Sequence, residues 1–232
     1  MTRLIPYLLA TAALVIFPME SRASLIITEV MSNSNHPGGA ANGDWWELTN
    51  TGASSVDLTD YYWDDGGPSG NDGALFPTIS IGAGESIVIV DENSGNVGDF
   101  VTAWGGGFTA ISKDDFGGPN DFSGLSAGGD QIQLWDADPN AGSANLVAEV
   151  LDTGDQGSPN AGFSFAWDQN GNSLGRSQIG SFGAFQATGD GNGGSGIDVG
   201  SPGFAAIPEP TSILSLSALF ALAAFVRRKR KN

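Results

Sequence analysis

Between residues 24 and 206 the sequence is a succession of short apolar or alternating segments, separated by turns rich in glycine, asparagine and aspartate. No part of this body shows a sustained apolar period of 3.6 residues, so long amphipathic helices are excluded. Short strands at this spacing with glycine-rich turns predict an all-β sandwich. The segments that we expect to form strands are 25–31, 44–50, 56–58, 61–63, 79–81, 85–90, 131–135, 146–151 and 163–167.

The chain contains no cysteine. Disulfide bonds, thiol catalysis and cysteine-ligated metal sites are therefore excluded. The stability of the body must come from packing, with bound calcium as a further contribution that the loops below allow.

The first residues have the layout of a secretory signal peptide. Arg3 precedes an apolar segment over residues 4–17, and Ser21 and Ala23 supply small residues at the −3 and −1 positions of a cleavage site. We expect a signal peptidase to cut after residue 23, so that the body is exported.

The last residues predict a single membrane helix. Residues 213–226 are apolar and uncharged, and a basic cluster follows that should remain cytoplasmic: Arg227, Arg228, Lys229, Arg230 and Lys231. As a helix this segment spans roughly 21 Å, which is short of the roughly 30 Å hydrocarbon core unless the bilayer thins or basic side chains extend to its surface. Pro208, Glu209 and Pro210 lie just before it.

This order of motif, helix and basic cluster resembles the PEP-CTERM sorting signal of Gram-negative bacteria. The resemblance implies that an exosortase, a membrane transpeptidase, recognises the tail and removes it around Pro208–Pro210. The implied destination is the outer cell surface or the extracellular matrix, after transient anchoring in the inner membrane. A plain C-terminal membrane anchor is the alternative.

The charge of the chain is strongly acidic, with a net value of −17. Only Lys113 and Arg176 are basic in the body, because the other basic residues lie in the two terminal segments. Such a surface repels phosphates, so we expect no nucleic-acid partner. It favours solubility, and it is compatible with binding divalent cations.

Several segments of the body resemble a bacterial lamin-tail domain: 25–31 (LIITEVM), 44–52 (DWWELTNTG), 56–58, 81–85, 125–126, 130–136, 173–176 and 200–203. The resemblance implies an immunoglobulin-like β-sandwich that serves as an attachment or interaction module, with no catalytic residues. The chain departs from the family pattern in a glycine-rich insert at 95–124 and in a spacer at 189–196. We therefore expect a signal peptide at 1–23, the sandwich at 24–187, a glycine-rich spacer at 188–206 and the sorting signal at 207–232.

Two kinds of binding site are compatible with the sequence. Calcium, which prefers six to eight oxygen ligands, fits loops that carry Asp136, Asp138, Asn140, Asp168, Asn170 and Asn172, and a third loop at 190–192. The same residues also favour ordinary turns. Aromatic side chains of Trp45, Tyr61 and Trp63 are candidates for a platform that binds polysaccharide or protein, or for packing in the core or under a loop.

Catalysis is poorly supported. The single histidine, His36, lies in a Pro- and Gly-containing loop that favours a solvent-exposed turn. Acidic residues are numerous enough that a carboxylate-dependent hydrolase remains an alternative, which requires two carboxyl groups roughly 5–10 Å apart across a cleft. We expect a non-enzymatic exported module that binds polysaccharide or protein, and a purely structural anchored protein is the third reading.

Overall fold

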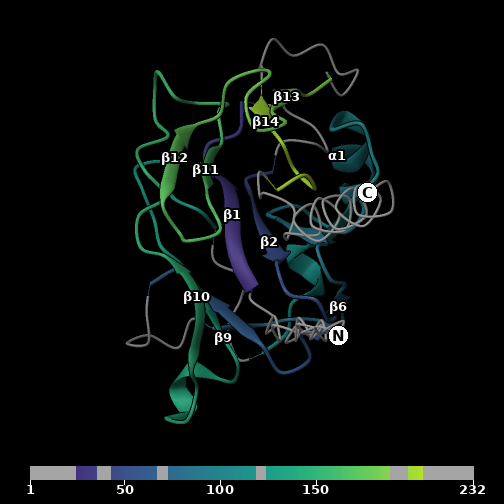
Figure 1. Cartoon of the computed structure of the whole chain (residues 1–232), viewed down its shortest axis with the longest axis vertical. Helices are drawn as coiled ribbons and strands as arrows, with labels where there is room; N and C mark the ends of the chain where they lie inside the picture. The colour runs from purple at the N-terminus through teal and green to yellow at the C-terminus, as the bar shows by residue number, and fades with distance from the viewer. Residues whose placement is uncertain (1–24, 36–42, 67–72, 119–123, 189–197, 206–232) are drawn as a thin grey trace, which may run out of the picture.

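The computed structural model describes residues 25–35, 43–66, 73–118, 124–188 and 198–205 (Figure 1). The predicted signal peptide, His36, the 190–192 loop and the predicted sorting signal lie outside these residues. Within the described ranges, no helix combines the length and the apolar character that crossing a membrane requires.

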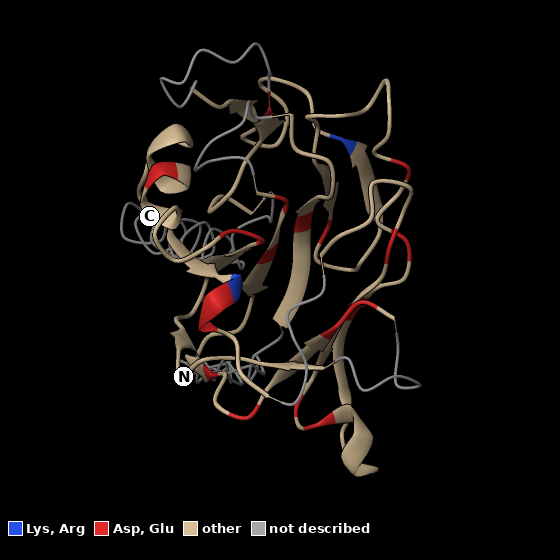
Figure 2. Cartoon of the chain, turned by 180° about the vertical axis from the view of Figure 1, so that it is seen from behind, with Lys and Arg blue, Asp and Glu red and all other residues tan. Residues whose placement is uncertain are grey.

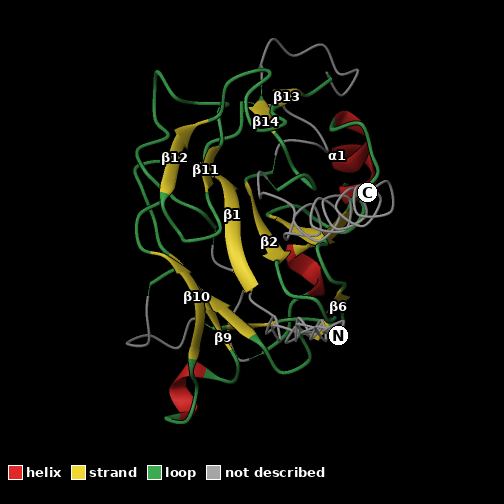
Figure 3. Cartoon of the chain, in the orientation of Figure 1, coloured by secondary structure: helices red, strands yellow, loops and turns green. Residues whose placement is uncertain are grey.

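The described chain is built mainly from β-strands, with one short α-helix (Figure 3). The largest sheet has six strands in the order β12-β11-β1-β2-β7-β8. Neighbouring strands are antiparallel except for β7 and β8, which are parallel. The strands are β1 (Leu25–Met31), β2 (Trp45–Asn50), β7 (Ser86–Val90), β8 (Thr109–Ser112), β11 (Phe165–Trp167) and β12 (Ser173–Arg176).

A second sheet of four strands has the order β10-β9-β4-β5, and two pairs of short strands complete the sheets. The second sheet contains β4 (Tyr62–Asp64), β5 (Ala74–Leu75), β9 (Ile132–Trp135) and β10 (Leu146–Val150). The pairs are β3 (Val56–Asp57) with β6 (Ser80–Ile81), and β13 (Phe185–Gln186) with β14 (Val199–Gly200). The helices are α1 (Val97–Ala103) and the 3-10 helices η1 (Lys113–Asp115) and η2 (Pro139–Ala141).

The main core lies between the two large sheets. Trp46 and Leu48 of β2 project into it, and the Trp46 ring lies 5.6 Å from that of Trp63 on the second sheet, centroid to centroid. Ile132 and Leu134 of β9 are fully buried in the same cluster. This packing of two sheets confirms the predicted all-β sandwich.

The opposite face of the six-stranded sheet, which we call the outer face, is also buried. Because side chains alternate along a strand, Trp45 points away from Trp46 and reaches this face. There it packs edge-on against Phe100 and Trp104, at 6.4 and 5.8 Å between ring centroids. The helix α1 therefore covers the outer face (Figure 1).

The insert at 95–124 is not an irregular loop, because it contains α1, β8 and η1. Phe100 and Ala103, three residues apart, form the buried side of α1. The helix ends at three consecutive glycines, Gly105–Gly107, which all have positive φ and so favour helix termination. Seven residues are too few to show a helical period in the sequence.

The predicted boundary between the sandwich and its spacer needs correction. Residues 198–205, expected to belong to a glycine-rich spacer, instead contain β14 and pack against the domain. Asp198, Val199, Ser201 and Pro202 are buried. We call residues 198–205 the closing segment, because it covers part of the outer face beside α1.

Candidate functional site: a buried pair of carboxylates under the closing segment

Two glutamates lie opposite each other on the outer face. In the register of β1 and β2, Glu29 is the direct partner of Glu47, and the register shifts between Ile27 and Glu29. Glu29 is 2% exposed and Glu47 is 0% exposed. Like charges opposite each other on a sheet are destabilising, and a buried charge requires hydrogen-bond donors, so this pair needs a specific environment.

The donors to Glu29 come mainly from three serines that are distant in sequence. The Ser164 hydroxyl donates to Glu29 Oε1 and the Ser177 hydroxyl lies 3.2 Å from the same atom. Ser201, in the closing segment, donates its backbone N–H to Oε1 at 2.9 Å and its hydroxyl to Oε2 at 2.7 Å. Both carboxylate oxygens are thus hydrogen-bonded.

Glu47 has fewer donors and a connection toward the surface. The backbone N–H of Gly203 donates to Glu47 Oε2 at 2.6 Å, and the Thr28 hydroxyl donates to Oε1 at 2.5 Å. From Thr28 a row of hydroxyls continues through Thr49 to Ser86, at 2.8 and 2.7 Å. Such a row passes a proton in either direction because each hydroxyl both donates and accepts.

The row of hydroxyls ends beside an open polar pocket of about 370 Å³. Ser86, Glu85 and Thr109 line this pocket together with Phe108 and Gly203. Gly203 therefore both covers Glu47 and forms part of the pocket wall. Hydrogen bonds through Thr28, Thr49 and Ser86 therefore connect the buried carboxyl group of Glu47 with the pocket.

The environment raises the pKa values of both glutamates. Burial and then the charge of Glu29 raise the pKa of Glu47 to about 8, against the hydrogen bonds from Thr28 and Gly203. Burial also raises the pKa of Glu29, and the donors of Ser164, Ser201 and Ser177 oppose that rise. Because the pKa of Glu47 is about 8 and that of Glu29 is also raised, the two facing carboxyl groups hold at least one proton at neutral pH.

Two glycines let the closing segment approach the glutamates. A Cβ on Gly200 would lie 2.9 Å from Ser164 Oγ and 3.0 Å from Glu29 Oε1. A Cβ on Gly203, whose φ is +83°, would lie 2.2 Å from Phe108 Cβ. Larger residues do not fit at either position without movement of the neighbours.

The start of the closing segment is fixed by a second acidic group. Asp198 accepts hydrogen bonds from the Ser34 hydroxyl at 2.6 Å and from the Asn35 backbone N–H at 2.7 Å. Asp44 accepts from the Ser34 N–H, and burial raises the pKa of Asp44 to about 6 with added repulsion from Asp91 and Asp198. The closing segment is thus held at both ends by carboxylates.

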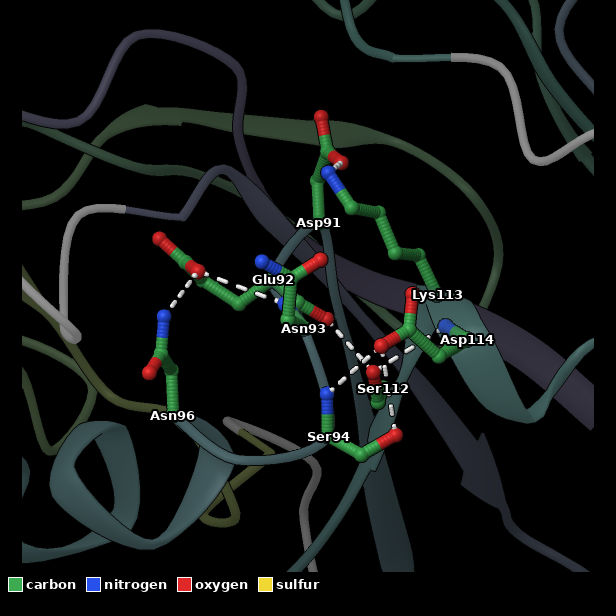
Figure 4. Close-up of polar contacts among 8 residues, drawn as sticks. All are labelled: Asp91, Glu92, Asn93, Ser94, Asn96, Ser112, Lys113 and Asp114. Carbon is green, nitrogen blue, oxygen red and sulfur yellow. Dashed lines mark hydrogen bonds and ion pairs between the residues drawn. The ribbon is translucent and has the colours of Figure 1, made fainter.

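The loop that leads from β7 to α1 is held by a network of polar contacts (Figure 4). Lys113 forms an ion pair with Asp91 at 2.8 Å, and the Ser94 N–H donates to Asp114 at 2.9 Å. The Asn96 side chain donates to Glu92 at 3.0 Å. These contacts fix the position from which α1 covers the outer face.

The carboxylates of the predicted calcium loops accept hydrogen bonds from their own loops. Asp168 Oδ1 accepts from the N–H groups of Asn170 and Asn172, at 2.8 and 2.9 Å. Asp136 accepts from Asn145, and Asp138 accepts from the Asn140 N–H at 2.8 Å. Within the described residues, no group of three or more His, Asp or Glu side chains is arranged to hold a metal ion. The hydrogen bonds that these three aspartates accept are those of ordinary turns.

The structure also places the three aromatic candidates. Trp45 is 0% exposed beneath α1, and Trp63 is 1% exposed in the main core. Tyr61 is half-buried and packs against the same core. A shared exposed platform of these residues is therefore excluded, because burial of the two indole rings in separate cores keeps them from any ligand.

Acidic positions far outnumber basic ones along the described chain (Figure 2). Each of the two basic residues of the body has a partner. Lys113 pairs with Asp91. Arg176 lies over the Phe163 ring, 4.4 Å from its centroid, and donates to Asn160 Oδ1 at 3.2 Å. The partners of Arg176 are thus an aromatic ring and an amide.

Sequence reasoning did not single out Glu29, Glu47 or the serines that surround Glu29. Both glutamates lie in strands at positions that face away from the main core, where a charged residue ordinarily meets solvent. They are buried only because the closing segment and α1 cover the outer face. The available signal was one glutamate inside each of two successive strands that are otherwise largely apolar or aromatic.

A comparison with protein families matches residues 18–154, more than half of the chain, to the Lamin Tail Domain model. The match contains β1 and β2 with both glutamates, whereas Ser164, Ser177 and Ser201 lie beyond it. Comparisons with curated proteins and with solved structures gave no match. The family match confirms the resemblance for the segments between residues 25 and 136, and with it an immunoglobulin-like sandwich. The chain belongs to the lamin tail domain family.

Proposed function

We propose that this chain is an exported, non-enzymatic module that attaches to or binds polysaccharide or protein outside the cell. In this proposal the signal peptide at 1–23 directs export, and the tail at 207–232 anchors the chain until an exosortase processes it at Pro208–Pro210. The mature domain then resides on the outer cell surface or in the extracellular matrix.

The observation that carries the non-enzymatic part is the enclosure of the carboxylate pair. A hydrolase that used two carboxyl groups would hold them across a cleft that admits its substrate. Glu29 and Glu47 instead face each other at 2% and 0% exposure, beneath the backbone of Ser201 and Gly203. Their hydrogen-bond partners come from the protein itself, which suits a structural role for the pair.

Membership in the lamin tail domain family supports a binding or structural module as well. The acidic surface disfavours partners that carry dense negative charge, such as nucleic acids. Neutral polysaccharides and proteins with basic patches remain compatible with it.

The sorting part is tested by following the mass and the location of the full chain in an exosortase-containing Gram-negative host. The test chain lacks Pro208–Pro210, and the control lacks three residues of the glycine-rich spacer, Gly193–Ser195. We expect the unaltered chain and the control to lose the tail and leave the inner membrane, while the test chain stays there at full length.

The alternative outcome is equally specific. If all three chains remain uncleaved in the membrane, the sorting proposal is abandoned and the purely structural anchored protein takes its place. Cleavage of the test chain at the same bond as the unaltered chain would also remove the assigned role of the motif.

A further inference from the structure

The exposed large hydrophobic side chains of the described residues fall into two groups. One group consists of Leu146, Val147 and Leu151, on and just after the edge strand β10. The other consists of Ile179, Phe182 and Phe204, which are 65%, 54% and 53% exposed. We call the second group the apolar end.

Ile179 and Phe182 lie in one tight turn, which runs beside the closing segment that carries Phe204. Within the turn, Gly180 donates its N–H to Ala184 O at 2.8 Å, and Ser181 donates to Gln178 O at 2.9 Å. A Cβ on Gly183 would lie 3.9 Å from Phe204 Cβ, so the turn passes close to Phe204. The patch thus joins two parts of the chain.

Phe182 is held in an unusual backbone conformation. Its φ is +50°, in the left-handed region that non-glycine residues rarely adopt. The surrounding turn keeps a bulky apolar side chain exposed in spite of this strain. Residues in such conformations concentrate at binding sites, where the strain serves a purpose.

Charge distinguishes the two groups. No charged residue occurs in 177–188 or in 199–205, in a chain whose net charge is −17. The other group is interleaved with acids, since Glu149 and Asp152 lie among its members. An anionic lipid surface would repel the β10 group and not the apolar end.

We propose that the apolar end rests on the lipid surface of the membrane in which the tail is anchored. This inference rests on the proposed function, because the anchor is the predicted helix at 213–226. Phe204 precedes Ile213 by nine residues, which an extended chain covers in at most about 30 Å. The anchor therefore holds the apolar end, rather than the far side of the domain, close to the bilayer surface.

Insertion of the three side chains would bury them at the boundary between headgroups and acyl chains. Aromatic side chains are favoured at that depth, and surface attachment strengthens with the apolar area that is buried. The contact would also fix the orientation of the domain while the sorting motif is still attached.

The absence of cysteine allows a clean test with the full chain. Ser181→Cys places one thiol beside the apolar end, and Ser143→Cys places one beside the β10 group, both at exposed positions. Each variant is labelled with an environment-sensitive dye and reconstituted into vesicles of phosphatidylethanolamine and phosphatidylglycerol. A fraction of the lipids carries a quencher near the headgroup, and flotation reports whether the chain is in the membrane.

We expect the dye at position 181 to be blue-shifted and quenched several-fold more strongly than the dye at position 143. Adding Phe182→Ser and Phe204→Ser to the Ser181→Cys chain should abolish most of that quenching, with flotation unchanged. Because both phenylalanines are more than half exposed, these substitutions leave the cores intact.

Three outcomes would overturn the proposal. A chain that floats with the vesicles and shows equal, weak quenching at both positions rejects the lipid contact and leaves the anchor standing. A blue shift at position 181 without lipid quenching indicates a protein partner or a second copy on the patch. A chain that does not float rejects the anchor, and the lipid contact with it.

Discussion

The two faces of the six-stranded sheet are both buried, but they are buried in different ways. The inner face meets the second sheet through aliphatic and aromatic side chains such as Trp46, Leu48 and Ile89. The outer face carries an apolar cluster around Trp45 and, beside it, the glutamate pair with its hydroxyl partners. Its cover comes from α1 and the closing segment, two parts far apart in sequence.

The two faces of this sheet therefore contribute to stability in different ways. Burial of apolar surface stabilises the inner face equally at pH 6 and pH 8, because none of the fully buried side chains of the main core titrates. The stability of the outer face depends on how many protons the glutamate pair holds. The inner face therefore maintains the fold, and the outer face controls how firmly the closing segment is attached.

The largest expected effect is on the inner face. Leu48→Ala removes a fully buried side chain from the main core and should lower the free energy of unfolding by about 2–5 kcal/mol. The loss should be the same at pH 6 and at pH 8. Urea denaturation of the full chain at both pH values measures it, and a loss that changed with pH would contradict the separation of the two faces.

The next effect is on the closing segment. Gly203→Ala forces a Cβ to within 2.2 Å of Phe108 Cβ at a positive φ, and it should cost about 2–4 kcal/mol. Gly84→Ala is the matched control, since its φ is +73° but no heavy atom lies within 4 Å of the new Cβ. We expect the control to cost only about 1 kcal/mol. Equal losses in denaturation experiments would show that the close approach to Phe108 is unimportant.

Part of this organisation was accessible from the sequence. Adjacent Trp45 and Trp46 must face opposite sides of a strand, and the structure confirms that they do. The expected strands at 25–31, 44–50 and 85–90 are the central strands of the large sheet. The prediction of these strands rested on short, mainly apolar segments bounded by turn residues.

The cover of α1 and the closing segment over the outer face could not be predicted from the sequence. It depends on contacts between residues that are far apart in the chain. Glu29 and Ser201 are 172 positions apart, and no local pattern connects them. Pro202 and Gly203 resemble a linker when only composition is considered. The fold places them on the glutamates because a register shift in β1 and two glycines allow the approach.

The next largest expected effect is a pH dependence of the free energy of unfolding, which comes from the outer face. The pKa of Glu47 is raised from 4.5 to about 8 on folding, so the folded chain binds the extra proton. Its contribution to stability is present in full below the unfolded pKa and is lost as the pH rises through about 8. Because the pKa of Asp44 is about 6, the glutamate pair dominates the dependence between about pH 6.5 and 8.

In that range we expect the free energy of unfolding to fall by up to about 1.4 kcal/mol per pH unit. Glu47→Gln, which keeps a neutral group of the same shape, should flatten this dependence. Glu149→Gln, on the exposed side of β10, should leave it unchanged. A slope that survives in Glu47→Gln would assign the titration to another group.

The smallest effect is expected in the surface loops. Hydrogen bonds from Asn172 and Asn170 lower the pKa of Asp168, so its contribution is lost only as the pH falls through the acidic range. Asp168→Ala should loosen one exposed turn without a resolved change in global stability. Calcium should raise the melting temperature no more than magnesium does. A calcium-specific rise in the melting temperature that Asp168→Ala abolishes would instead support a calcium site at Asp168.

The most direct test of the account is amide hydrogen exchange at Ser201 and Gly203, whose N–H groups donate to Glu29 and Glu47. Protection, corrected for the intrinsic rate at each pH, should fall about tenfold per pH unit between about pH 6.5 and 8. Amides of β7 should stay better protected than those of Ser201 and Gly203 across this range, and Glu47→Gln should remove the dependence at Gly203. Protection in β7 that is no higher than at Gly203, or no loss of protection at Gly203, would contradict proton-controlled attachment of the closing segment.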